Sequence, residues 1–91
     1  MSSLQEKFTK VSKIVEDNHD FITENFSNDN QLKLYSLFKQ STKGDCNINE
    51  PSILEFRKKA KYNAWKELEG IDSEVAMKNY IKKAKEMLIF N

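Results

Sequence analysis

Apolar residues recur along most of the chain at the three- and four-residue spacing of amphipathic helices. The first apolar stripe consists of Leu4, Phe8, Val11 and Ile14/Val15. It predicts a helix over about Leu4–Asp17. Ser3 followed by Glu6 is typical of a capping box, in which side chains satisfy the free amides of the first turn.

The following stretch, residues 18–31, is dense in Asn, Asp and Ser, whose side chains compete for backbone hydrogen bonds and favour turns. We therefore expect a loop here. Phe21, Ile22 and Phe26 interrupt the polar residues, and we expect them to fold the loop back onto the core.

Three further helices are predicted, over about Asp29–Lys43, about Leu54–Glu69, and from Asp72 as N-cap to about Ile89. Gly44 and Gly70 are expected to end the first two of these helices. The expected core stripe of the 29–43 helix is Leu32, Tyr35 and Phe38, broadened by Leu34 and Leu37. The 54–69 helix contributes Phe56, Ala60, Ala64 and Leu68, flanked by Tyr62 and by Trp65, a core residue. The last helix contributes Ala76, Tyr80, Ala84 and Leu88, widened by Val75, Ile81 and Met87.

Four amphipathic helices must cover one another's apolar stripes, so the predicted fold is an all-α four-helix bundle. The chain of 91 residues has room for one core, and we expect residues 1–91 to form a single domain. The connection over residues 44–54 is long. It can cross over and leave two consecutive helices running in the same direction.

Composition narrows the possible functions. The formal net charge is only +1, which argues against nucleic acid as a partner, although residues 31–70 hold eight Lys/Arg against five acids. Cys46 is the only cysteine, so no intrachain disulfide is possible and a reducing compartment fits. No apolar run approaches the length of a membrane span, and no secretory signal is visible. We expect a cytoplasmic protein.

The sequence offers no catalytic or metal-binding motif. His19 is the only histidine, and it lies far from Cys46, so both are better explained as ordinary structural residues than as a nucleophile pair. Zinc sites need several Cys or His, and no glycine-rich phosphate loop is present. We expect neither an enzyme nor a metal.

A binding function has better support. Tyr35 and Lys39 are four residues apart and share a helix face, and the helix after the long connection opens with the basic run 57–61. Tyr80 lies on an apolar face with a hydroxyl that needs a partner. Lysines beside aromatic rings suit a ligand with phosphates and a planar base. Spacing alone favours the plainer interpretation, in which the tyrosines are core residues and the lysines a solvated face.

An ordered set of residues changes that judgement. It begins with Tyr35-Ser-Leu-Phe-Lys39-Gln40, continues with Gly44-Asp45, Asn47 and Pro51, and ends with Lys59-Ala60-Lys61-Tyr62, Ala64-Trp65, Leu68, Gly70, Ala76-Met77 and Tyr80-Ile81. This set resembles the acyl-CoA-binding protein family, also called diazepam-binding inhibitor. The resemblance implies a bundle in up-down-down-up order. It also implies a non-enzymatic, monomeric carrier without cofactor that binds medium- to long-chain fatty acyl-CoA, one ester per monomer.

The resemblance also implies a site. Tyr35, Lys39 and Lys61 would contact the coenzyme A head group, chiefly its 3′-phosphate and adenine. Tyr80 would add a hydroxyl contact to the same ligand. Phe38 stands where the family has a second tyrosine beside the adenine, so it keeps the ring and loses the hydroxyl. The acyl chain would lie in a groove lined by the helices over 4–17, 29–43 and 54–69.

The chain departs from the family at two places. A family lysine late in the first helix falls here on Glu16, and Lys13, nearly one turn earlier, is a possible substitute. The connection between the first two helices is about four residues longer than in the family. Because that region lies near the acyl chain in the family, the longer loop is expected to alter chain-length preference.

Two other binding functions remain open. A helical protein-interaction module would use an apolar groove for a partner helix, and a groove for a peptide resembles a groove for a lipid in sequence. A nucleic-acid binder would use the basic run 57–61, but the low net charge disfavours it.

Overall fold

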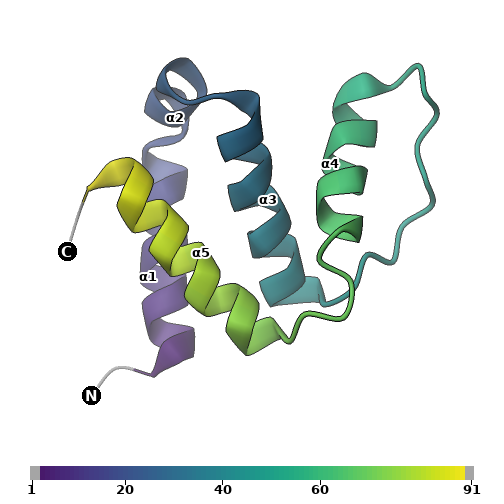
Figure 1. The fold of residues 1–91 in the computed structure, drawn as a ribbon. Helices are drawn as coiled ribbons and strands as arrows, with labels where there is room; N and C mark the ends of the chain where they lie inside the picture. The colour runs from purple at the N-terminus through teal and green to yellow at the C-terminus, as the bar shows by residue number, and fades with distance from the viewer. Residues whose placement is uncertain (1–2, 90–91) are drawn as a thin grey trace.

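The computed structural model describes residues 3–89, and within that range the chain is all-helical, with no strand (Figure 1). This confirms the predicted fold class. Residues 3–89 form five helices, one more than predicted. They are α1 (Leu4–Asp17), α2 (His19–Asn25), α3 (Asn28–Lys43), α4 (Phe56–Lys66) and α5 (Ser73–Leu88).

The helix ends follow local chemistry. The Ser3 hydroxyl accepts a hydrogen bond from the Glu6 amide at the start of α1, and Ser27 accepts one from the Asn30 amide at the start of α3. Gly44, directly after α3, has φ of 76°, and Gly70, in the α4–α5 connection, has φ of 88°; side chains rarely adopt this conformation. Asp72 precedes α5 as predicted, but its side chain makes no capping hydrogen bond.

The prediction of a loop over residues 18–31 is wrong, because α2 occupies half of it. The Asn18 side chain donates to the Ile14 carbonyl, and the Asn18 amide donates to the carbonyls of Ile14 and Val15, so α1 ends sharply and the chain turns into α2. Ile22 on α2 is buried in the core, whereas Phe21 is 51 % exposed. Burial of one side chain therefore overrides the local preference of Asn and Asp for turns.

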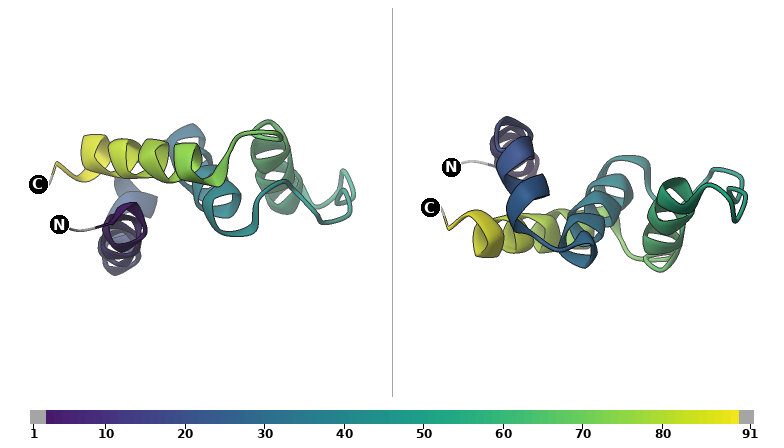
Figure 2. Two further views of the ribbon diagram at one scale, coloured as in Figure 1. Left: turned by 90° about the horizontal axis from the view of Figure 1, so that it is seen from below. Right: turned by 90° about the horizontal axis from the view of Figure 1, so that it is seen from above.

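The four long helices follow an up-down-down-up path. In Figure 1, α1 ascends, α3 descends, residues 44–55 climb back to the level at which α3 began, α4 descends and α5 ascends diagonally. The long connection is thus a crossover that makes α3 and α4 parallel. The two views in Figure 2 show an elongated, thin molecule, with principal extents of 44 × 30 × 16 Å. Helix α3 lies in the middle and packs against both α4 and α5, and α5 also packs against α1.

The main core cluster is built by α1, α2, α3 and α5, together with Leu68 from the connection between α4 and α5. Its buried residues are Phe8, Val11, Ile22, Leu34, Leu37, Leu68, Tyr80, Ala84 and Met87. Ala76 and Ala84 are fully buried, and these small side chains let α5 approach its neighbours closely. Trp65 is 2 % exposed, as predicted for a core residue.

Two predicted core stripes need correction. On α3 the buried apolar face is centred on Leu34 and Leu37, while Tyr35 is only partly buried and Phe38 is 37 % exposed. On α4, Phe56 is 77 % exposed and belongs to no core. Phe56 has helical spacing, but no neighbouring helix covers its side of α4, whereas Phe38 contacts Phe8 of α1 and Tyr80 of α5 and stays partly exposed at the edge of the core.

A buried side chain ties three segments together near the C-terminal end of α3. Gln40 is 1 % exposed, and its Nε2 donates to the Asp45 carboxylate at 2.9 Å and to the Ile71 carbonyl at 2.8 Å. The same Asp45 oxygen accepts from the Gly70 amide at 2.8 Å. These hydrogen bonds, the Gly70 bond first, hold the pKa of Asp45 below its usual range. Nearby, Trp65 Nε1 donates to the Gly44 carbonyl at 2.8 Å.

We predict that Gln40→Met lowers the free energy of unfolding by about 2–3 kcal/mol, because it removes two hydrogen bonds, one of them to a carboxylate, and leaves a carbonyl unpaired. Methionine keeps the length of the side chain, so little cavity forms. Urea unfolding measures the change. Gln5→Met, on an exposed residue of α1, is the control and is expected to have little effect. Equal stabilities of the two variants would contradict the role assigned to Gln40.

Candidate functional site

An open groove of about 420 Å³ lies between the N-terminal half of the chain and α5. Its wall from α1 and α2 consists of Ser12, Val15, Glu16, His19, Ile22 and Thr23. The opposite wall, from α3 and α5, consists of Gln31, Leu34, Tyr35, Phe38 and Tyr80. This size falls within the range of small-molecule sites, and the surface is largely apolar and aromatic with a few polar groups, as such sites usually are.

Three aromatic rings from three helices meet beside the groove. Phe8 on α1 stacks on Phe38 of α3 with ring centroids 5.8 Å apart, and Tyr80 of α5 lies edge-on to Phe8 at 5.1 Å. The centroids of Phe38 and Tyr80 are 6.0 Å apart. Phe8 and Tyr80 are buried and hold Phe38 at the groove, where its partly exposed ring can meet a ligand.

Tyr80 combines a buried ring with a hydroxyl that has no hydrogen-bond partner among residues 3–89. Desolvation raises the pKa of Tyr80 to about 12. The hydroxyl is therefore a neutral donor and acceptor at physiological pH, available to a ligand in the groove.

A basic pair surrounds Tyr35 at the rim of the groove. Lys39 Nζ, one turn further along α3, lies 5.9 Å from the centroid of the Tyr35 ring, and Lys61 Nζ, from α4, lies 5.3 Å from it. Lys39 is also 5.6 Å from the Trp65 ring centre. Both ammonium groups are held by cation–π contacts, and neither pairs with a carboxylate in the described part of the chain. Burial raises the pKa of Tyr35.

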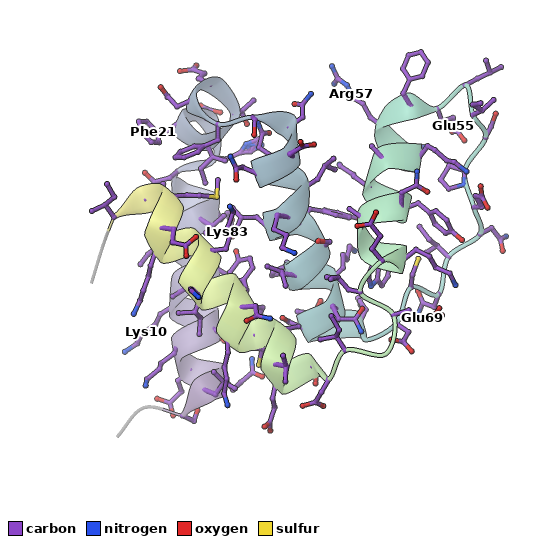
Figure 3. All side chains as sticks on the ribbon, in the orientation of Figure 1. Lys10, Phe21, Glu55, Arg57, Glu69 and Lys83 are labelled. Atoms are coloured by element: carbon purple, nitrogen blue, oxygen red, sulfur yellow. The ribbon has the colours of Figure 1, made fainter. Side chains whose placement is uncertain are left out.

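Most other basic residues of α4 are occupied or directed elsewhere. Lys58 pairs with Glu55 at 3.4 Å, and Lys59 pairs with Glu50 across the end of the long connection. Figure 3 shows Arg57 projecting from the first turn of α4, at the end of the helix farthest from Glu69. Of the basic run 57–61, Lys61 is the residue that joins the tyrosine of α3.

The structure thus brings the five predicted residues together in two contacting sets, Tyr35–Lys39–Lys61 and Phe38–Tyr80, both bordering one groove. The walls of this groove differ in part from those predicted for the acyl chain. Helix α4 supplies none of the described lining residues, and α2, which the sequence did not predict, supplies three. The apolar residues of the 18–31 segment, Ile22 among them, were the available signal for the missing α2 wall.

The structure does not place Lys13 in the lining of the groove. The Lys13 ammonium group pairs with Asp17 at 3.2 Å, which raises the pKa of Lys13. Glu16, at the family's lysine position, does line the groove.

The other chemical possibilities find little support in the structure. Among the residues described, no three His, Cys, Asp or Glu side chains gather as metal ligands would. Cys46 is a free, partly buried thiol in the crossover. None of the helices within residues 3–89 meets the length and hydropathy that a membrane crossing requires.

Comparison with known proteins agrees with this fold and site. A family model described as "Acyl CoA binding protein" matches residues 5–84. An acyl-CoA-binding protein of Dictyostelium discoideum is 42 % identical over 81 residues, which cover 89 % of this chain and 87 % of that protein. One from Ricinus communis is 45 % identical over 67 residues, 74 % of either chain.

Solved structures give the same result. The crystal structure of acyl-CoA-binding protein 2 from Oryza sativa superposes with a TM-score of 0.86 at 35 % identity, covering 94 % of this chain and 89 % of that one. The corresponding structure from Moniliophthora perniciosa gives 0.82 at 39 % identity, covering 98 % and 82 %. The fold and its open groove are those of a small helical binding protein. The chain belongs to the acyl-CoA-binding protein family.

We predict that the alkaline stability of the protein reports the burial of Tyr80. Below pH 10 the hydroxyl is protonated in folded and unfolded chains alike. As the pH rises from 10 toward the folded pKa of about 12, the Tyr80 hydroxyl ionises mainly in the unfolded chain. Ionisation of Tyr80 therefore lowers the free energy of unfolding over this range. Tyr80→Phe removes this effect. The difference in free energy of unfolding between Tyr80→Phe and wild type should therefore shift in favour of the variant by roughly 1 kcal/mol between pH 8 and pH 11.

Urea unfolding of both proteins across this pH range measures the change. Tyr62→Phe, on a partly exposed tyrosine outside the groove, is the matched control. A difference between Tyr80→Phe and wild type that stays constant with pH would show that the Tyr80 hydroxyl is solvated in the folded protein.

Proposed function

We propose that this chain is a non-catalytic carrier of medium- to long-chain fatty acyl-CoA esters, which sequesters the acyl chain and holds the 3′-phosphate and adenine of coenzyme A. Residues 1–91 act as a single acyl-CoA-binding domain. The protein works as a cytoplasmic monomer with one ester per chain, and it needs neither a cofactor nor nucleic acid.

The observation that carries this proposal is the position of two lysines around the Tyr35 ring, at the rim of an apolar groove, with no carboxylate partner within residues 3–89. Lys39 and Lys61 come from different helices, and their mutual repulsion is relieved when a phosphate lies between them. An anionic head group and an apolar tail are the two parts of a ligand that this arrangement suits.

The residue roles follow the resemblance and the geometry together. Tyr35, Lys39 and Lys61 hold the 3′-phosphate and adenine of the ligand. Phe38 offers a ring for stacking without a hydroxyl, and the Tyr80 hydroxyl, unpartnered within residues 3–89, adds a hydrogen bond.

The acyl chain supplies most of the affinity, and the head group supplies selectivity. Each buried methylene contributes about 0.8 kcal/mol, so a long chain contributes on the order of 10 kcal/mol before the losses of ligand and side-chain freedom. A free fatty acid keeps this apolar contribution but leaves both lysines without phosphates. Coenzyme A alone keeps the phosphates but leaves the apolar surface of the groove exposed to water. Neither half should bind as the ester does.

Helix α2 lies in the connection that the resemblance makes about four residues longer than in the family. It contributes Ile22 and Thr23 to the groove wall, and Phe21 packs edge-on against Phe26 at 6.2 Å just outside it. We propose that this added wall shifts the preferred acyl-chain length. Titrations with esters of increasing chain length that reproduce the ordinary family profile would exclude this effect.

We predict one-to-one binding of palmitoyl-CoA, and binding at least a hundredfold weaker for palmitate and for coenzyme A separately, since each retains only part of the interaction. Isothermal titration calorimetry with the three ligands measures this. Equal affinity for the ester and the free acid would show that no head-group site exists. It would favour the alternative of a helical protein-interaction module.

We predict that Lys39→Ala weakens palmitoyl-CoA binding by about 1.5–3 kcal/mol, the contribution of a hydrogen bond to a charged group. Lys61→Ala should behave alike, because the Lys61 ammonium group contacts the same ring. The thermal unfolding of both variants should stay near that of wild type, since both lysines are at least partly exposed. Lys43→Ala, one turn beyond Lys39 on the same helix and outside the groove, is the matched control. Unchanged affinity in Lys39→Ala would remove Lys39 from the site.

A further inference from the structure

One carboxylate lines the groove. Glu16, in the last turn of α1, is the only acidic residue among those described as lining it, and His19, three residues on, is its ionisable neighbour on the same wall. Tyr35 and Tyr80 complete the titratable groups of the groove, and both are neutral near pH 7 because burial raises their pKa values. Glu16 therefore places a negative charge in a site whose rim carries two lysines.

Glu16 contributes, after Asp17, to raising the pKa of Lys13, but it has no ion-pair partner within residues 3–89. Lys13, the closest lysine along α1, directs its ammonium group to Asp17 at 3.2 Å. Glu16 is an exposed residue, so water solvates it when the groove is empty. A ligand that displaces this water lowers the local dielectric and strengthens the interaction between the carboxylate and any charge on the ligand.

The two walls of the groove consequently have opposite effects on an anion. The wall of α3, with Tyr35 between Lys39 and Lys61, attracts phosphate. The corner between α1 and α2, with Glu16, repels it. Tyr35 belongs both to the lysine pair and to the groove lining, so the same ligand is exposed to both fields.

We propose that Glu16 is a specificity-determining residue that lowers the affinity of phosphate-rich ligands and confines their phosphates to the Tyr35–Lys39–Lys61 side. The corner between α1 and α2 then receives an uncharged part of the ligand. This inference rests on the proposed function, and it makes a distinct claim: the penalty grows with the number of phosphate charges. An acyl-CoA ester is penalised more than the same ester of dephospho-CoA, which lacks the 3′-phosphate.

The test compares wild type, Glu16→Gln and the control Glu24→Gln by calorimetric titration with palmitoyl-CoA and palmitoyl-dephospho-CoA. Glu24 is exposed on α2 outside the groove, so its variant makes the same change in net charge. At about 20 mM salt, Glu16→Gln should bind palmitoyl-CoA roughly three- to tenfold more tightly than wild type, and at about 200 mM salt the gain should shrink.

The gain should also be smaller with palmitoyl-dephospho-CoA, and Glu24→Gln should match wild type with both ligands. A merely structural effect of Glu16 would change both ligands equally and would not depend on salt. If wild type binds the ester and Glu16→Gln binds it equally well, the phosphates lie beyond the field of Glu16 and the inference fails. Weaker binding by Glu16→Gln would show that the carboxylate accepts a hydrogen bond from the ligand, which also overturns it. Failure of wild type to bind the ester would instead refute the proposed function.

Discussion

The Gln40 side chain is the constraint on which the arrangement of the last three helices depends. From one nitrogen it holds the Asp45 carboxylate at the start of the crossover and the Ile71 carbonyl just before α5, while Asp45 holds the Gly70 amide after α4. The end of α3, the start of the crossover and the α4–α5 turn are thereby fixed at one point. Since Lys39 directly precedes Gln40, and Trp65 of α4 is anchored to the Gly44 carbonyl beside this point, the same contacts fix how Lys39 and Lys61 face each other. A polar core network of this kind specifies geometry, which a uniformly apolar contact between smooth helices does less well.

The parts of the fold that the sequence predicted are those in which local pattern and tertiary contact agree. The stripe of Phe8 and Val11 is buried as expected, and α1 has the predicted bounds. The predictions failed where a neighbour, or its absence, decides the outcome. Burial of Ile22 in the core stabilises a helix in a segment whose composition favours turns. Phe56 stays exposed because no helix covers its side of α4. Periodicity records which residues share a face of a helix, but it does not record what lies opposite that face.

The candidate site shows the same division. The five residues taken from the family resemblance lie together, whereas the wall of α2 was found only in three dimensions, because a groove is a property of the space between elements. Charge illustrates this best. The sequence presents Lys58, Lys59 and Lys61 as equivalent members of a basic run, yet Lys58 and Lys59 have acidic partners and Lys61 has an aromatic one. Which lysines remain available to a ligand depends on partners that lie up to nine residues away or on another helix.

The position of α4 at one edge of the molecule has a consequence for motion. Among the described helices, α4 makes extensive contacts with α3 only. The crossover that precedes α4 is exposed along much of its length. Segments with few buried contacts open with less free energy than the whole domain needs to unfold. Opening of α4 moves Lys61 away from Tyr35 while leaving the groove between α1, α2, α3 and α5 intact. The lysine pair is thus divided between the central helix and an edge helix, and a bound ester that contacts both Lys39 and Lys61 would slow amide hydrogen exchange in α4 more than in the remaining helices.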